Sequence, residues 1–267
     1  MYPILLTIGP LHFYSYGLCL ALGLGLSIYL FAKDCGNKIS PKLDLTYQQG
    51  FQKAFDLGTW VIVASILGAR IFYVWENYTE FQNGHWLDAV KIWQGGLVFY
   101  GGLFGAIGAA ILWFRIEKWP VGYSFDLVAP YILLGHAIGR VGCFLNGCCY
   151  GIEDHVHGLV FPGAPDQLPH LPTQLWEMGG DLILFFLLLW ARKWTLRYNW
   201  LTFALYGFTY GLLRTIVEFW RRSWDKRYLV YFNSASQAVS GMIVLVSVLV
   251  ILWIVLKRRK TQQAPVN

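Results

Sequence analysis

Three arginines stand inside stretches that are otherwise apolar: Arg70, Arg140 and Arg214. An arginine within a membrane span is costly unless it meets a counter-charge, water or a lipid phosphate, so each is a candidate functional residue. A guanidinium group can hold a phosphate with two parallel hydrogen bonds and does not lose its charge. The three residues therefore indicate a site for a phosphate-containing ligand. The alternative is pairing with a carboxylate, and Glu218 stands four residues after Arg214 on the same helical face.

The segment around Arg140 is rich in glycine and reads GRVGCFLNGCCYG over residues 139–151. Its glycines free backbone N–H groups that can face an anion beside Arg140, and Asn146 adds a further polar side chain. Gly139 and Gly142 could instead form a surface for close helix packing. That alternative leaves Arg140 and Asn146 unexplained.

A second glycine-rich segment, 93–105, opens another apolar stretch and contains two Gly-Gly pairs, the second being Gly101-Gly102. The pairs allow a ligand or a neighbouring helix to approach the backbone closely. Tyr100 directly precedes the second pair. Its hydroxyl would reach the membrane interface, where a tyrosine could equally be only a member of the aromatic belt.

Three of the five cysteines, Cys143, Cys148 and Cys149, fall within the glycine-rich segment 139–151. No other ligand lies at a spacing typical of structural zinc sites. We therefore expect packing residues at the end of a span and no metal site. A membrane thiol-redox protein that uses Cys148 and Cys149 is an alternative.

The composition predicts an all-α integral membrane protein. Of the 267 residues, 56% are hydrophobic and only 13% are charged, against about 25% charged residues in soluble domains. The simplest architecture is one helical domain over residues 1–267 in a lipid bilayer. The net charge of +6 comes from basic residues in short loops and the tail, so it indicates membrane orientation and not nucleic acid as a partner.

Seven stretches approach the roughly 20 apolar residues that a helix needs to cross a bilayer. The fifth is short and could begin earlier, near Gln174. The seven are residues 11–31, 57–75, 95–114, 125–145, 179–191, 200–217 and 238–256.

Basic residues in the loops predict the orientation of these spans. With seven spans, thirteen Lys and Arg residues fall on one side of the membrane and five on the other. The side richer in Lys and Arg is usually cytoplasmic. We therefore expect an extracytoplasmic N-terminus, an extracytoplasmic loop around 152–171 and a basic cytoplasmic tail at 257–267. Arg70, Arg140 and Arg214 would then all lie in the outward third of their spans.

Across most of its length the chain resembles the bacterial phosphatidylglycerol–prolipoprotein diacylglyceryl transferase family. The combination of the 139–151 segment with an Arg-x3-Glu-Phe-x-Arg element is the specific part of this resemblance. The matching elements are Tyr16-Gly17, Gly68-Ala69-Arg70, the two Gly-Gly pairs, Asp126 with Ala129-Pro130, residues 139–151, residues 172–177, and Arg214 to Arg221.

The resemblance implies transfer of the diacylglyceryl group of phosphatidylglycerol to the lipobox cysteine of prolipoprotein signal peptides. The products are a thioether and glycerol phosphate, no cofactor is needed, and the location is the bacterial cytoplasmic (inner) membrane. Arg140 and Arg214 would clamp the phosphate, Glu218 would orient Arg214, and Tyr100 would relay a proton. The expected substrate-binding residues are Arg140, Tyr16, Arg70, Asn146, Gly151, Gly101, Gly102, Gln174 and Glu177.

The chain departs from the best-known members of this family at three positions. Tyr100 replaces a histidine that has been considered as a base, Cys143 replaces an asparagine, and Cys148 replaces an acidic residue. Two further alternatives follow. One is an anion or lipid carrier that uses the intramembrane arginines, against which no inverted repeat is visible, and the other is a diverged transferase with a different acceptor.

The orientation is testable with Asp166→Cys and Gln262→Cys, each made in an otherwise cysteine-free chain. We expect a membrane-impermeant thiol reagent to label position 166 in intact cells and position 262 only after permeabilisation. Labelling of position 262 but not 166 in intact cells would reverse the assignment.

Overall fold

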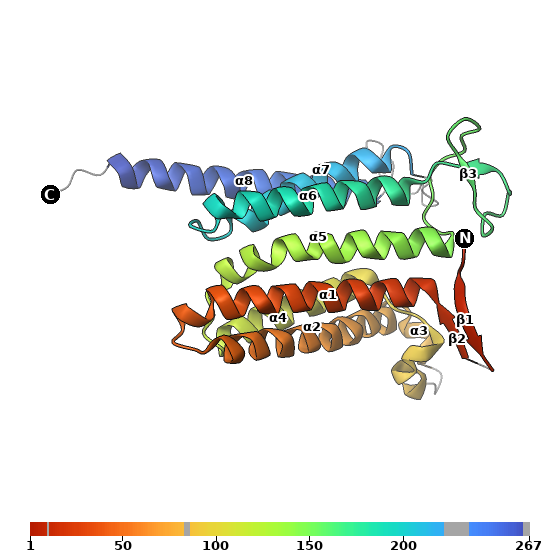
Figure 1. The fold of residues 1–267 in the computed structure, drawn as a ribbon. Coiled ribbons are helices and arrows are strands. Elements are labelled where there is room, and N and C mark those ends of the chain that lie inside the picture. Colours follow the sequence, from red (N-terminus) through yellow and green to blue (C-terminus); the bar gives the residue numbers. More distant parts are fainter. Residues whose placement is uncertain (10, 83–85, 222–234, 264–267) are drawn as a thin grey trace. The chain divides into compact units, whose positions relative to one another are not determined.

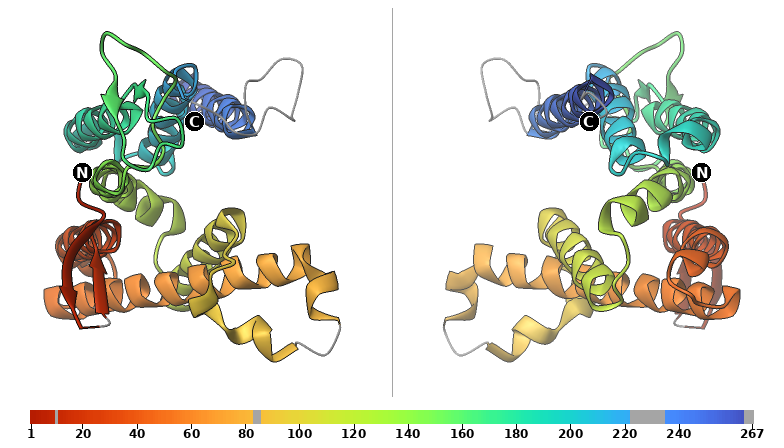
Figure 2. Two further views of the ribbon diagram at one scale, coloured as in Figure 1. Left: turned by 90° about the vertical axis from the view of Figure 1, so that its right-hand side faces the viewer. Right: turned by 90° about the vertical axis from the view of Figure 1, so that its left-hand side faces the viewer.

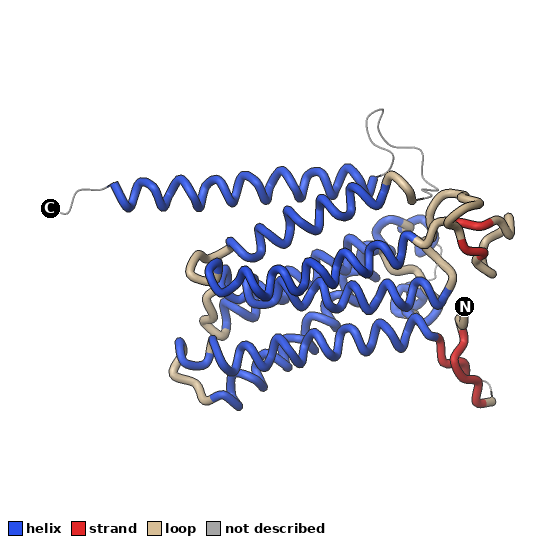
Figure 3. Tube along the Cα trace, turned by 45° about the horizontal axis from the view of Figure 1, so that its top comes forward, coloured by secondary structure: helices blue, strands red, loops and turns tan. Residues whose placement is uncertain are grey.

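The computed structural model describes residues 1–267 except 10, 83–85, 222–234 and 264–267 (Figure 1). Helices make up most of the described chain, and strands occur only in short hairpins (Figure 3). The chain packs as two compact units. The first unit comprises residues 1–30 and 125–267, and the second comprises residues 31–124.

Each of the seven predicted spans contains a long helix, which confirms an all-α membrane protein, although the helix of the third span starts at Phe99 and not at Gly95. Six of the helices are long and apolar enough to cross a membrane. The exception among the seven is α7, because Arg214, Glu218 and several hydroxyl-bearing residues lower its hydropathy. The seven are α1 (Ser15–Lys38), α2 (Tyr47–Glu76), α4 (Phe99–Ile116), α5 (Val121–Asn146), α6 (Thr173–Thr195), α7 (Leu201–Glu218) and α8 (Ala235–Gln263).

The prediction for the first span was wrong at its start. Residues Leu11–Tyr14 form strand β2, which pairs antiparallel with β1 (Ile4–Ile8). Bulky and aromatic residues of this kind favour an extended backbone, and Gly9 at φ +57° begins the turn between the strands. The helix starts only at Ser15, whose N–H donates to the carbonyl of Pro3 at 2.9 Å.

The second unit is built around α2 and α4, which contact each other along much of their length (Figure 2). Gly101 makes the close approach possible. A β-carbon at this position would fall 2.6 Å from Cβ of Phe72 and closer still to the carbonyl oxygen of Gly68. Small residues let membrane helices pack in this way. The remaining elements of the unit are short: η1 (Ser40–Lys42), α3 (Tyr78–Phe81), η2 (Trp86–Val90) and η3 (Ile92–Gln94).

In the first unit, α7 lies between α6 and α8 (Figure 2). Asp126 on α5 fixes the start of α7. Its two carboxylate oxygens accept hydrogen bonds from the N–H groups of Trp200 at 2.7 Å and Phe203 at 2.8 Å. The first N–H groups of a helix lack partners within the helix, so this buried carboxylate replaces the usual capping side chain. It also sets the position of α7 along α5.

The segment that follows α5 folds back as a compact cap. Strands β3 (Leu159–Val160) and β4 (Pro169–His170) form a short hairpin. The ring of Tyr150 stacks on Phe161 with centroids 5.0 Å apart and contacts His170 at 4.6 Å. Phe161 and His170 are fully buried. The predicted loop around 152–171 is therefore an ordered element with its own small core.

The packing of α2 on α4 is tested by Gly101→Ala, with Gly108→Ala on the same helix as the matched control. No atom lies within 4 Å of a β-carbon at Gly108. We expect Gly101→Ala to destabilise the protein by about 1–3 kcal/mol, the usual range for overpacking, and Gly108→Ala to be close to neutral. Thermal unfolding in detergent measures both, and equal melting temperatures would contradict the close contact.

Candidate active site

One buried carboxylate holds two arginines from two other helices. Glu177 lies near the start of α6 and is 1% exposed. Its Oε1 accepts a hydrogen bond from Nη2 of Arg140 on α5 at 2.8 Å. Nη1 of Arg214 on α7 lies 3.3 Å from the same oxygen and 3.5 Å from Oε2. The structure thus brings together three of the predicted site residues and joins α5, α6 and α7 through them.

Arg214 has two further partners. Its Nη2 lies 2.8 Å from Oε2 of Glu218, one turn later on α7. Nη2 and Nε also donate to Oγ of Ser236 on α8 at 2.9 and 3.1 Å. The carboxylate pairing that the sequence offered as an alternative for Arg214 is therefore present. It fixes the guanidinium plane and leaves Arg214 few free donors.

Arg140 is less fully engaged than Arg214. Its side chain is 12% exposed, and its Nε is buried without a hydrogen-bond partner among the described residues. A buried donor without a partner costs about 1–3 kcal/mol. This N–H is therefore available to an anionic ligand. With Glu177, Glu218 and Arg214 the four formal charges cancel, so an incoming anion would be stabilised mainly by oriented N–H donors.

A second pair, of a half-buried histidine and a buried carboxylate, lies one helical turn away. Nδ1 of His136 is 2.7 Å from Oδ2 of Asp181, and Asp181 is fully buried. His136 precedes Arg140 by four residues on α5, and Asp181 follows Glu177 by four on α6. Neither residue was among the site residues predicted from the sequence. Their four-residue spacing from other ionisable groups was the available signal.

The first turn of α6 holds the backbone that follows α5. Nε2 of Gln174 donates to the carbonyl oxygen of Cys148 at 2.7 Å, and Oγ1 of Thr173 donates to that of Cys149 at 3.2 Å. Both donors are buried. The substrate-binding role predicted for Gln174 stays a prediction, because the contact present here fixes the chain around the cysteines.

The atoms around Gly151 leave no room for a side chain larger than that of glycine. A β-carbon there would lie 2.8 Å from Cγ2 of Thr173 and closer still to the carbonyl oxygen of Trp220. Its backbone also bridges Arg221 in the chain that follows α7. Asn146 is the last residue of α5. Both residues therefore lie in the turn that leads from α5 toward α6, and their roles toward substrate stay predictions.

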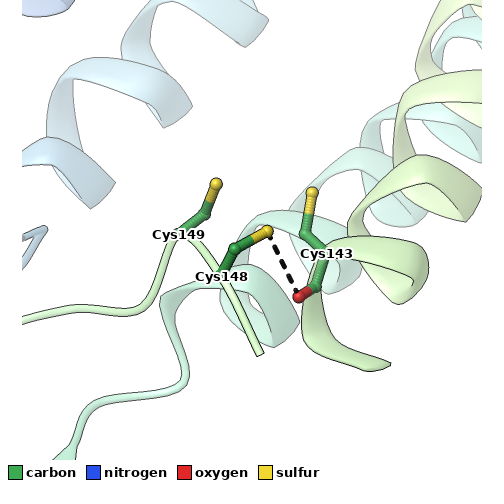
Figure 4. A group of neighbouring side chains, drawn as sticks. All are labelled: Cys143, Cys148 and Cys149. Atoms are coloured by element: carbon green, nitrogen blue, oxygen red, sulfur yellow. Dashed lines mark hydrogen bonds between the residues drawn. The ribbon is translucent and has the colours of Figure 1, made fainter. Parts of the chain in front are cut away.

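The three cysteines of this segment converge. The Sγ atoms of Cys143, Cys148 and Cys149 all lie within 4.8 Å of one another (Figure 4). Cys143 is on the last turn of α5, and the chain reverses through Gly147 at φ +72° and Cys149 at φ +66°. The prediction that these cysteines are packing residues at the end of a span stays untested, but their proximity was not predicted. Linear spacing did not reveal the cluster because it depends on this reversal.

Tyr16 lies beside the same part of α5. It is the second residue of α1 and is 41% exposed. A β-carbon at Gly142 would fall 3.2 Å from Cα of Tyr16 and 2.9 Å from Cβ of Cys19. Gly142 therefore allows α1 to pack closely on α5, which is the helix-packing alternative considered for this glycine. The same packing places Tyr16 next to the turn that carries Arg140.

Arg70 belongs to the second unit and binds its own chain. Nε donates to the carbonyl of Ala89 at 2.7 Å and Nη2 to that of Asp88 at 2.6 Å. Nη1 donates to the carbonyls of Gly95 at 2.7 Å and Gly96 at 3.0 Å. Four hydrogen bonds to backbone carbonyls thus occupy the guanidinium group. The contacts identify Arg70 as an anchor for the loop before α4, and its role in headgroup binding stays a prediction.

Tyr100, Gly101 and Gly102 also belong to the second unit, on the first turn of α4. Tyr100 is 40% exposed and contacts the ring of Phe99 edge-on at 5.7 Å. A β-carbon at Gly102 would lie 3.1 Å from Oγ of Ser65 on α2. The Gly-Gly pair therefore admits a neighbouring helix, one of its two expected uses. The proton relay assigned to Tyr100 stays a prediction.

Comparison with known proteins identifies the family. Residues 3–253 match the model of a family described as prolipoprotein diacylglyceryl transferase. The chain belongs to this family. It is 31% identical over 270 residues to the phosphatidylglycerol–prolipoprotein diacylglyceryl transferase of Oceanobacillus iheyensis, covering 96% of this chain and 88% of that protein. The protein of the same name from Clostridium tetani is 31% identical over 257 residues, covering 94% of this chain and 96% of the relative.

The bridging carboxylate of this diacylglyceryl transferase family member is tested by Glu177→Gln. Removing one partner of a buried ion pair typically costs about 3–5 kcal/mol, because the remaining charge is buried without compensation. We expect Glu177→Gln to lower the melting temperature strongly and Glu177→Gln/Arg140→Gln to recover part of the loss. A double-mutant cycle on thermal unfolding measures the coupling. Additive losses would show that Glu177 and Arg140 do not interact.

Proposed function

We propose that this chain transfers the diacylglyceryl group of phosphatidylglycerol to the cysteine thiol of a prolipoprotein signal peptide and releases glycerol phosphate. The family match over residues 3–253 supports a transferase that lies in a membrane. The observation that supports this reaction most directly is the buried group in which Arg140 and Arg214 share Glu177.

The reaction is a displacement at a glycerol carbon. The new bond joins the cysteine sulfur to this carbon, the carbon–oxygen bond to the phosphate breaks, and the phosphate leaves with the electron pair. The proton of the thiol ends on the released glycerol phosphate or on water. The reaction therefore requires two things of the site. It must stabilise the growing negative charge of the leaving phosphate, and it must favour deprotonation of the thiol to a thiolate.

Arg140 and Arg214 are suited to the first task. Oriented N–H donors in a site that excludes water stabilise charge that develops in the transition state and need not reorganise. Glu177 and Glu218 hold the two guanidinium groups in place. Nε of Arg140 is the buried donor that remains for the phosphate. A nearby guanidinium group also favours the thiolate form of an incoming cysteine.

We further propose that the site faces the outer leaflet of the bacterial cytoplasmic membrane. The support is the excess of basic residues in the loops assigned to the cytoplasm, thirteen against five. Phosphatidylglycerol would enter from the bilayer, and the prolipoprotein would reach the site with its signal peptide still in the membrane. The folded cap over 152–171 would then lie outside the membrane, next to the end of α5.

Purified protein, phosphatidylglycerol and a lipobox peptide provide the test, with mass spectrometry to detect a diacylglyceryl adduct on the peptide cysteine. In this assay we expect Arg140→Lys and Arg214→Lys each to lose roughly a hundredfold in rate, because the point charge of lysine cannot keep the planar hydrogen bonds to Glu177 and also present an oriented N–H donor to the phosphate. Arg70→Lys should mainly lower thermal stability, since its arginine binds backbone carbonyls.

A lipobox peptide with Cys→Ser and vesicles without phosphatidylglycerol serve as controls, and neither should give an adduct. Near-normal turnover of well-folded Arg140→Lys and Arg214→Lys proteins would exclude the phosphate clamp. Absence of any adduct with the wild-type protein, under conditions in which a known member of the family is active, would exclude the proposed reaction.

A further inference from the structure

Three cysteines lie close together at the end of α5, near Arg140. They are Cys143, Cys148 and Cys149. Their sulfurs lie within 4.8 Å of one another, and Sγ of Cys148 points toward the main-chain carbonyl of Cys143, 3.7 Å away (Figure 4). Cys143 is buried, whereas Cys148 and Cys149 are half-buried. The cluster is therefore close-packed and also partly open.

The backbone of the cluster is strained and firmly held. Cys149 adopts φ +66°, a left-handed conformation that costs a residue with a side chain roughly 1–2 kcal/mol. The buried side chains of Gln174 and Thr173 fix the carbonyls of Cys148 and Cys149, which belong to the two peptide groups that flank Cα of Cys149. Strain that the surroundings maintain in this way is concentrated at functional positions.

We propose that the three cysteines bind one zinc ion and leave its fourth position open for the thiol of the prolipoprotein cysteine. This inference rests on the proposed transfer reaction and names an additional component of its site. Thiolates are soft ligands that zinc accepts. A catalytic zinc site has three protein ligands and one open position, whereas a structural site has four protein ligands. Three ligand residues group here among the described residues.

The geometry needs only a small adjustment. With zinc–sulfur distances of about 2.3 Å, the sulfurs of a tetrahedral site stand about 3.8 Å apart. The most distant pair of cysteine sulfurs would therefore approach by at most about 1 Å, which rotation about the Cα–Cβ bonds can provide. Bound zinc with three thiolates carries a net charge of −1. Arg140, three residues before Cys143 on α5, and Arg221, whose backbone pairs with Gly151, are the nearby cations that would balance this charge.

Zinc at this place would supply the activation that the acceptor thiol requires. A thiol that coordinates zinc is deprotonated outright. The metal-bound sulfur would then attack the glycerol carbon while the carbon–oxygen bond to the phosphate breaks, and the thioether product would leave the metal as a weaker ligand. Zinc is not oxidised or reduced. The thiol proton leaves to water, and the phosphate takes the electron pair of the broken bond beside Arg140.

The metal site can be tested without measuring transfer. Wild-type protein is purified in detergent under reducing conditions, stripped with a chelator and titrated with Zn²⁺. We expect elemental analysis to give one zinc per chain for the wild type and for the control Cys19→Ala/Cys35→Ala. The variant Cys143→Ala/Cys148→Ala/Cys149→Ala should retain none. No stoichiometric zinc in the wild type, a disulfide within the cluster under these conditions, or equal zinc in the triple variant would overturn the proposal.

The open position is tested by X-ray absorption at the zinc edge. The resting site should show three sulfur neighbours at about 2.3 Å and one lighter atom. A lipobox peptide should add a fourth sulfur, and its Cys→Ser form should not. A spectrum unchanged by the peptide would overturn the role of zinc as thiol activator.

Transfer assays separate this inference from the proposed function. If both hold, chelation should lower the transfer rate at least tenfold, Zn²⁺ should restore it, and Cys19→Ala/Cys35→Ala should behave as the wild type. Full transfer by chelated protein would leave the proposed function intact and overturn the zinc. One bound zinc without any transfer would overturn the proposed function and, with it, the activating role of the metal.

Discussion

The first unit depends on the shared carboxylate of Glu177. The helices α5 and α7 each carry an arginine into the bundle, and neither arginine could remain there without a partner. Glu177 on α6 meets both and holds the three helices in register, while Glu218 supplies the second negative charge beside Arg214. Asp126 supports this arrangement from the other end of α7, because its carboxylate fixes where that helix begins. The helix positions and the site are therefore set by the same few charges.

Much of the fold could be predicted from hydropathy, because a helix that crosses a bilayer must be long and apolar. The ends of the helices were harder. The hydrophobic residues of Leu11–Tyr14 suit a strand as well as a helix, and pairing with Ile4–Ile8 decided between them. The helix α2 starts ten residues before its predicted span, where a capping box between Thr46 and Gln49 begins an extension that hydropathy alone does not mark.

Residues of the candidate site could be predicted where a charged side chain stood in or next to an otherwise apolar stretch. Arg140, Arg214 and Glu218 stood out for this reason, and the structure brings them together around Glu177. Contacts that arise from chain reversal were not predictable. The cysteine cluster depends on the left-handed residues Gly147 and Cys149, whose conformation has no clear sequence signal. Arg70 was singled out by the same reasoning, and the structure adds a local explanation for its position in the carbonyls that it binds, while its role toward substrate stays a prediction.

The polar character of α7 has a consequence for how the protein is made. Because this helix carries Arg214 and Glu218 and is not among the six that are apolar enough to cross a membrane unaided, it is a poor substrate for insertion as a single segment. Its counter-charge, Glu177, lies on the helix synthesised just before it, and Ser236 lies on the helix synthesised just after it. We therefore expect insertion of α7 to depend on α6, so that the two helices enter the lipid together with Arg214 and Glu177 already paired.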